Sequence, residues 1–313
     1  MKHGNGMSGA WIRAVVVLLM AAGAIVAVNA QNENQITFFL SARTVTGEPV
    51  ADLKPEDLAV AEDGRATPVV KMVPVNWPVK VTVLVDNGAD TGQLLSQYRS
   101  GLKAFLAALP AGLEVSILTL APQPRWIIRP TSDAEQLQKS VDRITPDQSS
   151  PRFVEGLVEA ANRIEQENRK QVVNFPVIVM VSTTGLEGST SREPEINKMG
   201  RQLLTYPSRV HVIMLSTGGS SSTQLVGARQ VHVGKSVADL TGGRYEAIAA
   251  STRIPALLGE YGQMIAEAHA FQSHQYMVTV QRAAGSSVTV GQMMTGPTRA
   301  GIRLTPTAQG LKP

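Results

Sequence analysis

The chain of 313 residues contains no cysteine, which excludes disulfide bonds, thiol catalysis, thiolate-bound metal and lipid attachment through cysteine. Aromatic residues make up only 4% of the sequence, which argues against a sugar-binding groove lined by aromatic rings. The chain has no cluster of Lys and Arg with interleaved aromatics, so it carries no signal for nucleic-acid binding. After residue 30, 27 basic residues nearly balance 25 acidic ones. The fold must therefore be stabilised by its core alone, without covalent links.

The first thirty residues have the order of a secretory signal. Lys2 and Arg13 accompany an apolar run of 15 residues from Ala14 to Val28, and this segment contains no acidic residue. The run ends in Val28-Asn29-Ala30, a small-residue cleavage site before Gln31. A membrane span needs about 20 apolar residues, so a cleaved signal is favoured over an uncleaved anchor. We expect a periplasmic or secreted protein that is held at the membrane only if this segment stays uncleaved.

Residues 77–272 alternate between buried strands and helices. Four apolar runs are typical of parallel strands buried on both faces, at residues 79–85, 115–120, 177–181 and 210–215. Helical periods lie near residues 94–109, 137–144, 153–164 and 254–265. This alternation predicts a doubly wound, mostly parallel α/β sheet. Within it, the Gly/Ser-rich segment 216–236 predicts an exposed, mobile loop.

Strand patterns with a period of two lie on both sides of the α/β region. The N-terminal β segment, residues 31–76, alternates at residues 36–43 and has a hairpin signal at Asp63-Gly64. The C-terminal β segment, residues 273–313, shows the same period at residues 276–280, 288–290 and 302–304. Each flank has too few strands to be stable by itself. We therefore predict that the flanks pair into one small sandwich, with Trp77 packed at its junction with the inserted α/β domain.

Four short segments around and within the α/β region suggest a family. They are GEPVADL at residues 47–53, DLAVAEDG at 57–64, ADLTGGRY at 238–245, and Gln275-Tyr276. In this order, over residues 36–305, the chain resembles bacterial exported proteins with a von Willebrand factor type A domain. The resemblance implies a metal-ion-dependent adhesion site, formed by Asp-x-Ser-x-Ser, a Thr and a later Asp at the carboxyl ends of the strands. Such oxygen ligands suit the octahedral preference of Mg²⁺.

The sequence departs from the adhesion-site pattern at most of its positions. Asp86 matches the first Asp, but Gly88 replaces the first Ser and Pro151 stands where the Thr is expected. The remaining candidate ligands for Mg²⁺ or another divalent cation are Asp86, Asp90, Ser150 and Thr184. We favour a degenerate site that binds no metal, with Asp86 and Asp90 capping the helix that follows. No other cofactor is expected.

Motifs for enzymatic chemistry are incomplete. Gly234-Lys235-Ser236 lacks the first glycine of a phosphate-binding loop, because Arg229 occupies that position. The chain has no Gly-x-Ser-x-Gly nucleophile elbow. His211 lies inside an apparent strand, which favours a core histidine over a catalyst. His269 and His274 flank a helix-to-strand junction and make a weak zinc pair.

These patterns favour a non-catalytic protein-binding module exported to the cell envelope. The resemblance implies that it recognises an unidentified protein through the carboxyl-end loops at residues 86–93, 146–152, 183–193 and 216–236. Their charged residues, which are contact candidates by position alone, are Arg152, Glu187, Arg192 and Arg229. Two alternatives stay open: a structural subunit of an envelope assembly that uses its β flanks, and a hydrolase with an unrecognised site. Nucleotide and nucleic-acid partners are not expected.

Overall fold

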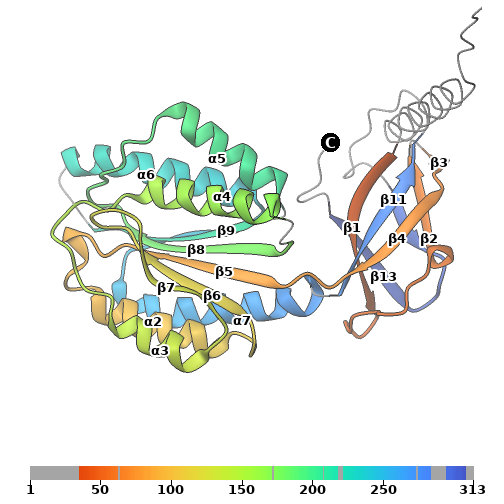
Figure 1. Cartoon of the computed structure of the whole chain (residues 1–313), viewed down its shortest axis with the longest axis horizontal. Helices are drawn as coiled ribbons and strands as arrows, with labels where there is room; N and C mark the ends of the chain where they lie inside the picture. Colours follow the sequence, from red (N-terminus) through yellow and green to blue (C-terminus); the bar gives the residue numbers. More distant parts are fainter. Residues whose placement is uncertain are drawn as a thin grey trace, which may run out of the picture.

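The computed structural model describes residues 35–62, 64–170, 173–206, 208–217, 221–272, 274–282 and 294–307, with residues 221–228 described by their backbone alone. The predicted signal segment 1–30 and the strand predicted at 288–290 lie outside these residues. Figure 1 shows a layered α/β domain beside a smaller body of β-strands. The predicted fold class is therefore confirmed.

A six-stranded sheet forms the centre of the α/β domain. Its order is β10-β9-β8-β5-β6-β7, and every neighbouring pair is parallel except β6 and β7. The strands are β5 (Val79–Val85), β6 (Glu114–Thr119), β7 (Arg125–Thr131), β8 (Phe175–Thr183), β9 (Arg209–Leu215) and β10 (Tyr245–Ile248). All nine residues of β8 are buried, as its nearly continuous apolar sequence predicts for a strand covered on both faces.

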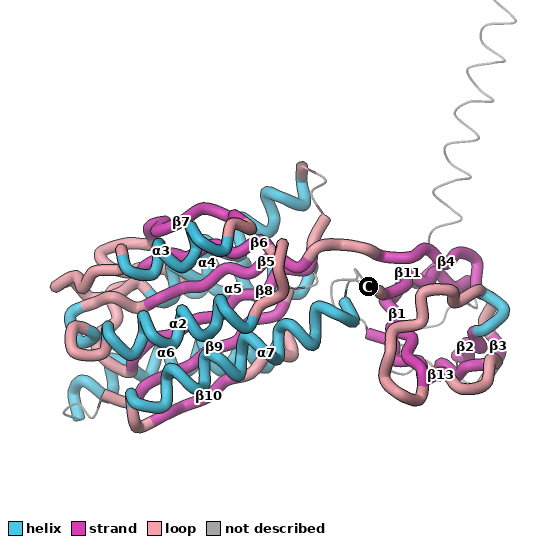
Figure 2. The backbone as a smooth tube through the Cα atoms, turned by 90° about the horizontal axis from the view of Figure 1, so that it is seen from below, coloured by secondary structure: helices cyan, strands magenta, loops and turns pink. Residues whose placement is uncertain are grey.

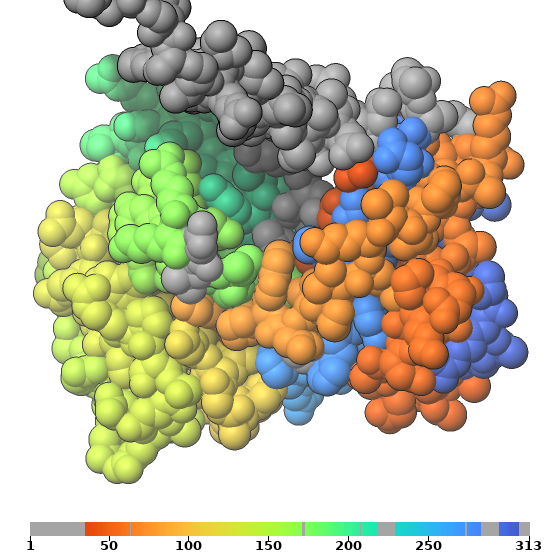
Figure 3. All heavy atoms as spheres, turned by 45° about the vertical axis from the view of Figure 1, so that its right-hand side comes forward, coloured from red at the N-terminus to blue at the C-terminus, as the bar shows by residue number. Residues whose placement is uncertain are grey.

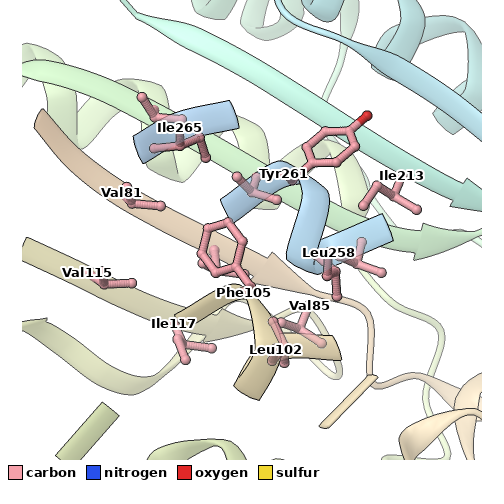
Figure 4. Packing of buried hydrophobic residues seen from close by; sticks show 14 of the residues in the cluster. Val81, Val85, Leu102, Phe105, Val115, Ile117, Ile213, Leu258, Tyr261 and Ile265 are labelled. Atoms are coloured by element: carbon pink, nitrogen blue, oxygen red, sulfur yellow. The ribbon is translucent and has the colours of Figure 1, made fainter. Parts of the chain in front are cut away.

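Helices cover both faces of this sheet, as Figure 1 shows. One layer contains α4 (Phe153–Arg169), α5 (Glu193–Thr205) and α6 (Ser221–Leu240). The opposite layer contains α2 (Leu95–Ala108), α3 (Ala134–Asp142) and α7 (Ile254–Gln272). Figure 4 shows the second interface, where Phe105 of α2 and Tyr261 of α7 meet sheet residues such as Val81 and Ile213. Because each helix buries a periodic apolar face, each side of the sheet has its own core.

Two features of the α/β domain differ from the sequence prediction. The segment predicted as a mobile loop over 216–236 is largely the helix α6. The Ser- and Gly-rich composition near its start favours a loop, but buried residues recur further along at helical spacing. These residues are Gln230, Val233, Val237 and Thr241. Helix α5 is not among the helices predicted from the sequence. Two signals mark its start: Pro194 lies in the first turn, and the Glu195 carboxylate accepts a hydrogen bond from the Arg192 backbone N–H.

Strands from both flanks build the smaller body. One sheet has the order β13-β1-β11-β4 and the other β12-β2-β3. The strands are β1 (Gln35–Thr44), β2 (Leu58–Glu62), β3 (Arg65–Ala66), β4 (Val69–Val75), β11 (Gln275–Gln281), β12 (Met294–Pro297) and β13 (Ile302–Thr307). N-terminal β1 lies between C-terminal β11 and β13, so the red-orange and blue atoms of Figure 3 meet in one body. The predicted pairing of the flanks is therefore observed.

The two faces of β1 serve different purposes. Phe38, Leu40 and Ala42 point into the sandwich core, as the period of two predicts. Phe39 points the other way and meets the edge of Trp77 at 5.2 Å between ring centroids. Trp77 also packs against Phe175 at the start of β8, at 5.3 Å. Three aromatic rings thus join the sandwich to the α/β domain at the amino ends of its parallel strands, and Figure 2 shows the two chain connections there.

Candidate functional site

The carboxyl ends of the parallel strands lie at the end of the α/β domain that faces away from the sandwich (Figure 1). In open α/β sheets this edge is where ligands bind. The predicted metal-site residues lie here, on the β5–α2, α3–α4 and β8–α5 connections. We describe each of them before the loops that surround them.

Asp86 follows β5 and is fully buried, with 0% exposure. Its Oδ1 accepts the Gly88 N–H at 2.9 Å, and its Oδ2 accepts the Ser182 hydroxyl at 2.9 Å. The N–H and hydroxyl of Thr183 also approach Oδ2, at 3.2 and 3.3 Å. Burial raises the pKa of Asp86, and these hydrogen bonds oppose the rise. Asp86 therefore ties the end of β5 to the end of β8 with both of its oxygens engaged.

Gly88 and Pro151 fit together where the adhesion-site pattern has two hydroxyl ligands. A Cβ atom at Gly88 would lie 2.5 Å from Pro151 Cδ and 3.0 Å from the Ser149 carbonyl oxygen. A serine therefore cannot replace Gly88 unless Pro151 moves. The two departures from the pattern therefore depend on each other: the Pro151 ring fills the space next to the end of β5 that a side chain at Gly88 would need.

Asp90 and Gly185 form a second close contact. A Cβ at Gly185 would lie 2.0 Å from Asp90 Oδ2, so the carboxylate covers this glycine. The same oxygen accepts the Leu186 N–H at 3.1 Å. The prediction that Asp86 and Asp90 cap the following helix is wrong: Leu94 is the N-cap of α2, and no side chain caps it. Both carboxylates bind the β8 end of the sheet instead.

Of the other two candidate ligands, Thr184 is engaged within the protein and Ser150 is closely packed against the β8–α5 loop. Thr184 Oγ1 accepts the Thr217 N–H at 3.2 Å. Ser150 is half-buried, and its Cβ lies close enough to Gly188 that a side chain there would meet it at 3.0 Å. Among the described residues, no three His, Asp or Glu side chains gather as a metal site would require. An octahedral ion needs several free oxygens, and the hydrogen bonds of Asp86, Asp90 and Thr184 leave this set poorly suited to one.

The β8–α5 loop, residues 184–192, is the most heavily tethered part of this edge. Gln230 of α6 is fully buried, and its amide donates to the carbonyls of Thr183 at 2.5 Å and Gly185 at 3.1 Å. Arg229 donates to the carbonyl oxygens of Ser189, at 3.0 Å, and Ser191. Two successive residues of one helix thereby hold both ends of the loop.

Helix α4 holds the same loop from its other side. Ser189 Oγ accepts the N–H groups of Val154 at 3.0 Å and Glu155 at 3.2 Å, so it caps α4 from outside that helix. Glu155 in turn accepts the N–H and hydroxyl of Thr190, at 2.9 and 2.8 Å. Burial opposes ionisation, but the bonds from Thr190 and Arg152 lower the pKa of Glu155.

Three of the four charged contact candidates, Arg152, Glu187 and Arg229, are parts of this scaffold. The Glu187 side chain is 3% exposed and lies 3.8 Å from the Arg229 guanidinium. Arg152 pairs with Glu155 at 3.1 Å and donates to the Pro122 carbonyl at 2.7 Å. Arg192 is exposed. Sequence position alone could not separate these roles, because Pro122 is distant from Arg152 along the chain and Arg229 is distant from Glu187.

A hollow of about 460 Å³ opens beside this loop. It lies between the ends of β9 and β10 and the β5–α2 connection. Its lining includes the exposed Asp90 and the hydroxyl-bearing Ser216, Thr217 and Ser251. The carboxyl edge therefore combines a fixed loop with an adjacent polar depression.

The residues considered for enzymatic or zinc chemistry lie away from this edge, and their contacts are those of structural residues. Gly234-Lys235-Ser236 lies within α6, where Lys235 pairs with Asp239 at 2.8 Å, and not in a phosphate-binding loop. His211 is 4% exposed in β9, as predicted for a core histidine. His274 meets the Ala270 carbonyl oxygen at 3.0 Å, and burial followed by the charge of His274 lowers the pKa of His269.

A layered α/β sheet with polar loops at its carboxyl edge defines the class of open, doubly wound binding domains. Residues 81–182 match the family model described as a von Willebrand factor type A domain. This match lies within the α/β domain and agrees with the resemblance that the sequence motifs indicate. A comparison with curated proteins gives no match.

Solved structures resemble this chain at low sequence identity. A von Willebrand factor type A protein from Catenulispora acidiphila is 11% identical with a TM-score of 0.51, over 90% of this chain and 74% of that one. An aerotolerance-related membrane protein from Bacteroides fragilis is 12% identical (TM-score 0.40; 59% and 99% covered). The conserved hypothetical protein BatB from Bacteroides thetaiotaomicron is 13% identical (TM-score 0.42; 60% and 98%). In the described part of this chain, no helix has the length and apolar character that crossing a membrane requires.

Proposed function

We propose that this protein is a non-catalytic protein-binding module of the cell envelope, periplasmic or secreted, that recognises its partner through the carboxyl edge of the sheet. The tethered β8–α5 loop carries this proposal. Hydrogen bonds with Glu155 of α4, Gln230 of α6 and Asp90 hold its backbone, while Leu186 remains 45% exposed at its surface. A loop that is rigid before binding loses little conformational entropy in the complex.

Binding at this edge relies on direct side-chain contacts in our proposal, and not on a bridging metal ion. Asp86 is saturated by four hydrogen bonds, and Pro151 fills the space that a hydroxyl ligand at Gly88 would need. The partner would place side chains on Leu186 and into the neighbouring hollow that contains Asp90. Aliphatic and polar contacts next to each other are typical of protein interfaces.

A specific observation favours the second candidate, a structural subunit that uses its β flanks. Strand β4 is an edge strand of the four-stranded sheet, and its Val70 is 53% exposed. Such an edge offers backbone groups for pairing with another chain. For the third candidate, a hydrolase, the test is turnover of generic ester, peptide or glycoside substrates that a single substitution abolishes.

Site-specific photo-crosslinking separates the two binding surfaces. A photoreactive amino acid replaces Leu186 in one variant and Val70 in the other, because both are exposed aliphatic residues at opposite ends of the molecule. In the native host, Leu186 should crosslink one dominant protein that Val70 does not. Purified partner should then bind the Leu186→Asp variant at least about tenfold more weakly than wild type, with Val70→Asp as the matched control. Crosslinking through Val70 alone would reject the carboxyl edge and favour the structural subunit.

A further inference from the structure

A second cavity lies between the two domains, at the end of the α/β domain opposite to the carboxyl edge. This interdomain cleft has a volume of about 320 Å³, within the size range of small-molecule sites. The C-terminal end of α7 and the starts of β8 and β9 form one wall, and strands of the sandwich form the other. The lining of the cleft includes Phe39, Arg43, Phe175, Arg209, Phe271 and Gln275.

Positive charge enters the cleft from both domains. The guanidinium of Arg43, on β1, lies 3.2 Å from the centre of the Phe271 ring of α7. Stacking uses the face of the guanidinium, so its N–H edge can still donate to a ligand. In the described part of the chain no hydrogen bond or ion pair engages the Arg43 side chain. Half-buried Arg209 enters from the start of β9, and no carboxylate is among the described residues of the lining.

An unused hydrogen-bond acceptor lies in the same cleft. Gln275, the first residue of β11, is only 7% exposed, and its Oε1 has no hydrogen-bond partner among the residues that the structure describes. A buried polar atom without a partner costs free energy, and a ligand that donates an N–H or O–H would remove that cost. Gln275 lies opposite Ser41 in the β1–β11 ladder, on the face of β1 that also carries Arg43.

Aromatic rings complete the walls. Phe39 and Phe175 meet edge to face at 5.5 Å between ring centroids, and Phe271 lies under Arg43. Phe39 and Phe175 are almost fully buried and close the floor of the cleft, so half-buried Phe271 offers the apolar surface next to the two guanidinium groups. An anion with an aromatic or aliphatic group would therefore find a partner for each of its parts.

We propose that the interdomain cleft binds a small organic carboxylate with a neighbouring N–H or O–H donor and an apolar group. The carboxylate lies on Arg43, where the nearby charge of Arg209 also favours an anion, the donor bonds to Gln275 Oε1, and the apolar group lies against Phe271. This chemistry occurs in N-acylated amino acids and at the C-terminal residue of a peptide. The bound molecule touches both domains, and the cleft is separate from the partner-binding edge.

Hippurate is a suitable probe because it combines a carboxylate, an adjacent N–H and a phenyl ring. Calorimetric titration of the full chain should show saturable binding in the millimolar range or tighter. Hippurate methyl ester, which lacks the anion, and benzoate, which lacks the N–H, should each bind at least about tenfold more weakly. Absence of saturable hippurate binding, or equal affinity for the ester, would overturn the proposal without any variant.

Two substitutions assign the binding to the cleft. Arg43→Gln and Gln275→Leu should each weaken hippurate binding by about tenfold or more. Arg65→Gln, which removes an exposed arginine from β3 of the same sandwich, should leave the affinity unchanged. Far-ultraviolet circular dichroism checks the folding of each variant. Wild-type affinity in folded Arg43→Gln would place the ligand elsewhere and overturn the proposal.

A pair of peptides distinguishes the two sources of this chemistry. Acetyl-Gly-Gly-Phe with a free carboxylate should bind more tightly than hippurate if the natural ligand is a peptide terminus, and more weakly if it is a free acylated amino acid. The same peptide with an amidated end should not bind in either case. Binding of the amidated peptide at the affinity of the free acid would contradict the role of the arginines.

Discussion

His211 is the residue through which mild acid should weaken this protein. Its ring is 4% exposed, and its Nδ1 accepts the Arg244 backbone N–H at 3.1 Å. The ring of Tyr261 meets it edge to face at 5.6 Å. Burial, with the positive charges of Arg209 and Arg244, lowers the pKa of His211 from 6.5 to about 3. The neutral imidazole is therefore the form that the fold accepts.

The depressed pKa determines how stability depends on pH. In the unfolded chain His211 titrates near its ordinary value of about 6.5, so between pH 6.5 and 3 the unfolded state binds more protons than the folded state. The free energy of unfolding therefore falls as the pH falls through this window, and the contribution is fully present only above it. For these two pKa values, a change from pH 7 to pH 5 removes about 2 kcal/mol.

Replacing His211 by Asn should abolish this loss. The Asn Oδ1 can still accept the Arg244 N–H, while the smaller side chain lowers the free energy of unfolding by about 1–3 kcal/mol relative to wild type at pH 7. Urea unfolding at pH 7 and pH 5, followed by circular dichroism, gives both free energies. The difference in the free energy of unfolding between wild type and variant should be about 2 kcal/mol smaller at pH 5 than at pH 7.

The exposed His232 provides the control, because His232→Asn should keep the pH dependence of the wild type. If His211→Asn loses as much stability between pH 7 and pH 5 as the wild type does, the reasoning fails. The acid sensitivity would then arise from other groups.

Three further predictions test the carboxyl edge and the domain junction. Gly88→Ser should destabilise the fold by about 1–3 kcal/mol in urea, because its Cβ would lie 2.5 Å from Pro151 Cδ, and adding Pro151→Ala should recover most of the loss; an unchanged Gly88→Ser variant would contradict the close fit. Calorimetric titration with Mg²⁺, Mn²⁺ and Ca²⁺ should show no saturable binding at millimolar concentration; saturation that Asp86→Ala abolishes would instead establish a metal site. Trp77→Ala should cost about 2–4 kcal/mol, since the half-buried ring packs on Phe39 and Phe175, whereas Trp77→Phe should retain most of the stability in thermal unfolding; equal losses for both variants would refute the ring-packing argument.

The parts of the fold that depend on periodicity could be predicted from the sequence. The continuous apolar run of β8 predicts a strand covered on both faces, and all its residues are buried. The alternation around Phe38 and Leu40 predicts the core-facing side of β1. Each flank has too few strands to be stable by itself, which predicts that the two flanks pair with each other. Each of these arguments uses the burial of apolar surface, which leaves a regular trace along the chain.

The parts that depend on specific polar contacts could not be predicted. No pattern indicates that Gln230 donates to Thr183, or that Ser189 caps α4, because these partners are distant along the chain. The helix α6 was missed because serines and glycines dominate the composition around its start. The mutual fit of Gly88 and Pro151 depends on atomic distances that residue types alone do not contain. The sequence located the edge where these residues meet, and the structure shows how they occupy it.

The position of β1 between β11 and β13 has a consequence for the order in which this chain acquires its structure. The chain is synthesised from its N-terminus, so β1 is made long before its two neighbours in the sheet. Leu40 of β1, for example, pairs with Tyr276 and Pro306. The intervening α/β domain has a complete sheet of its own, so it can fold first and bring residues 75 and 275 together. That step shortens the loop that must close before the sandwich forms. Until then the apolar face of β1 is available to chaperones or to a second copy of the chain.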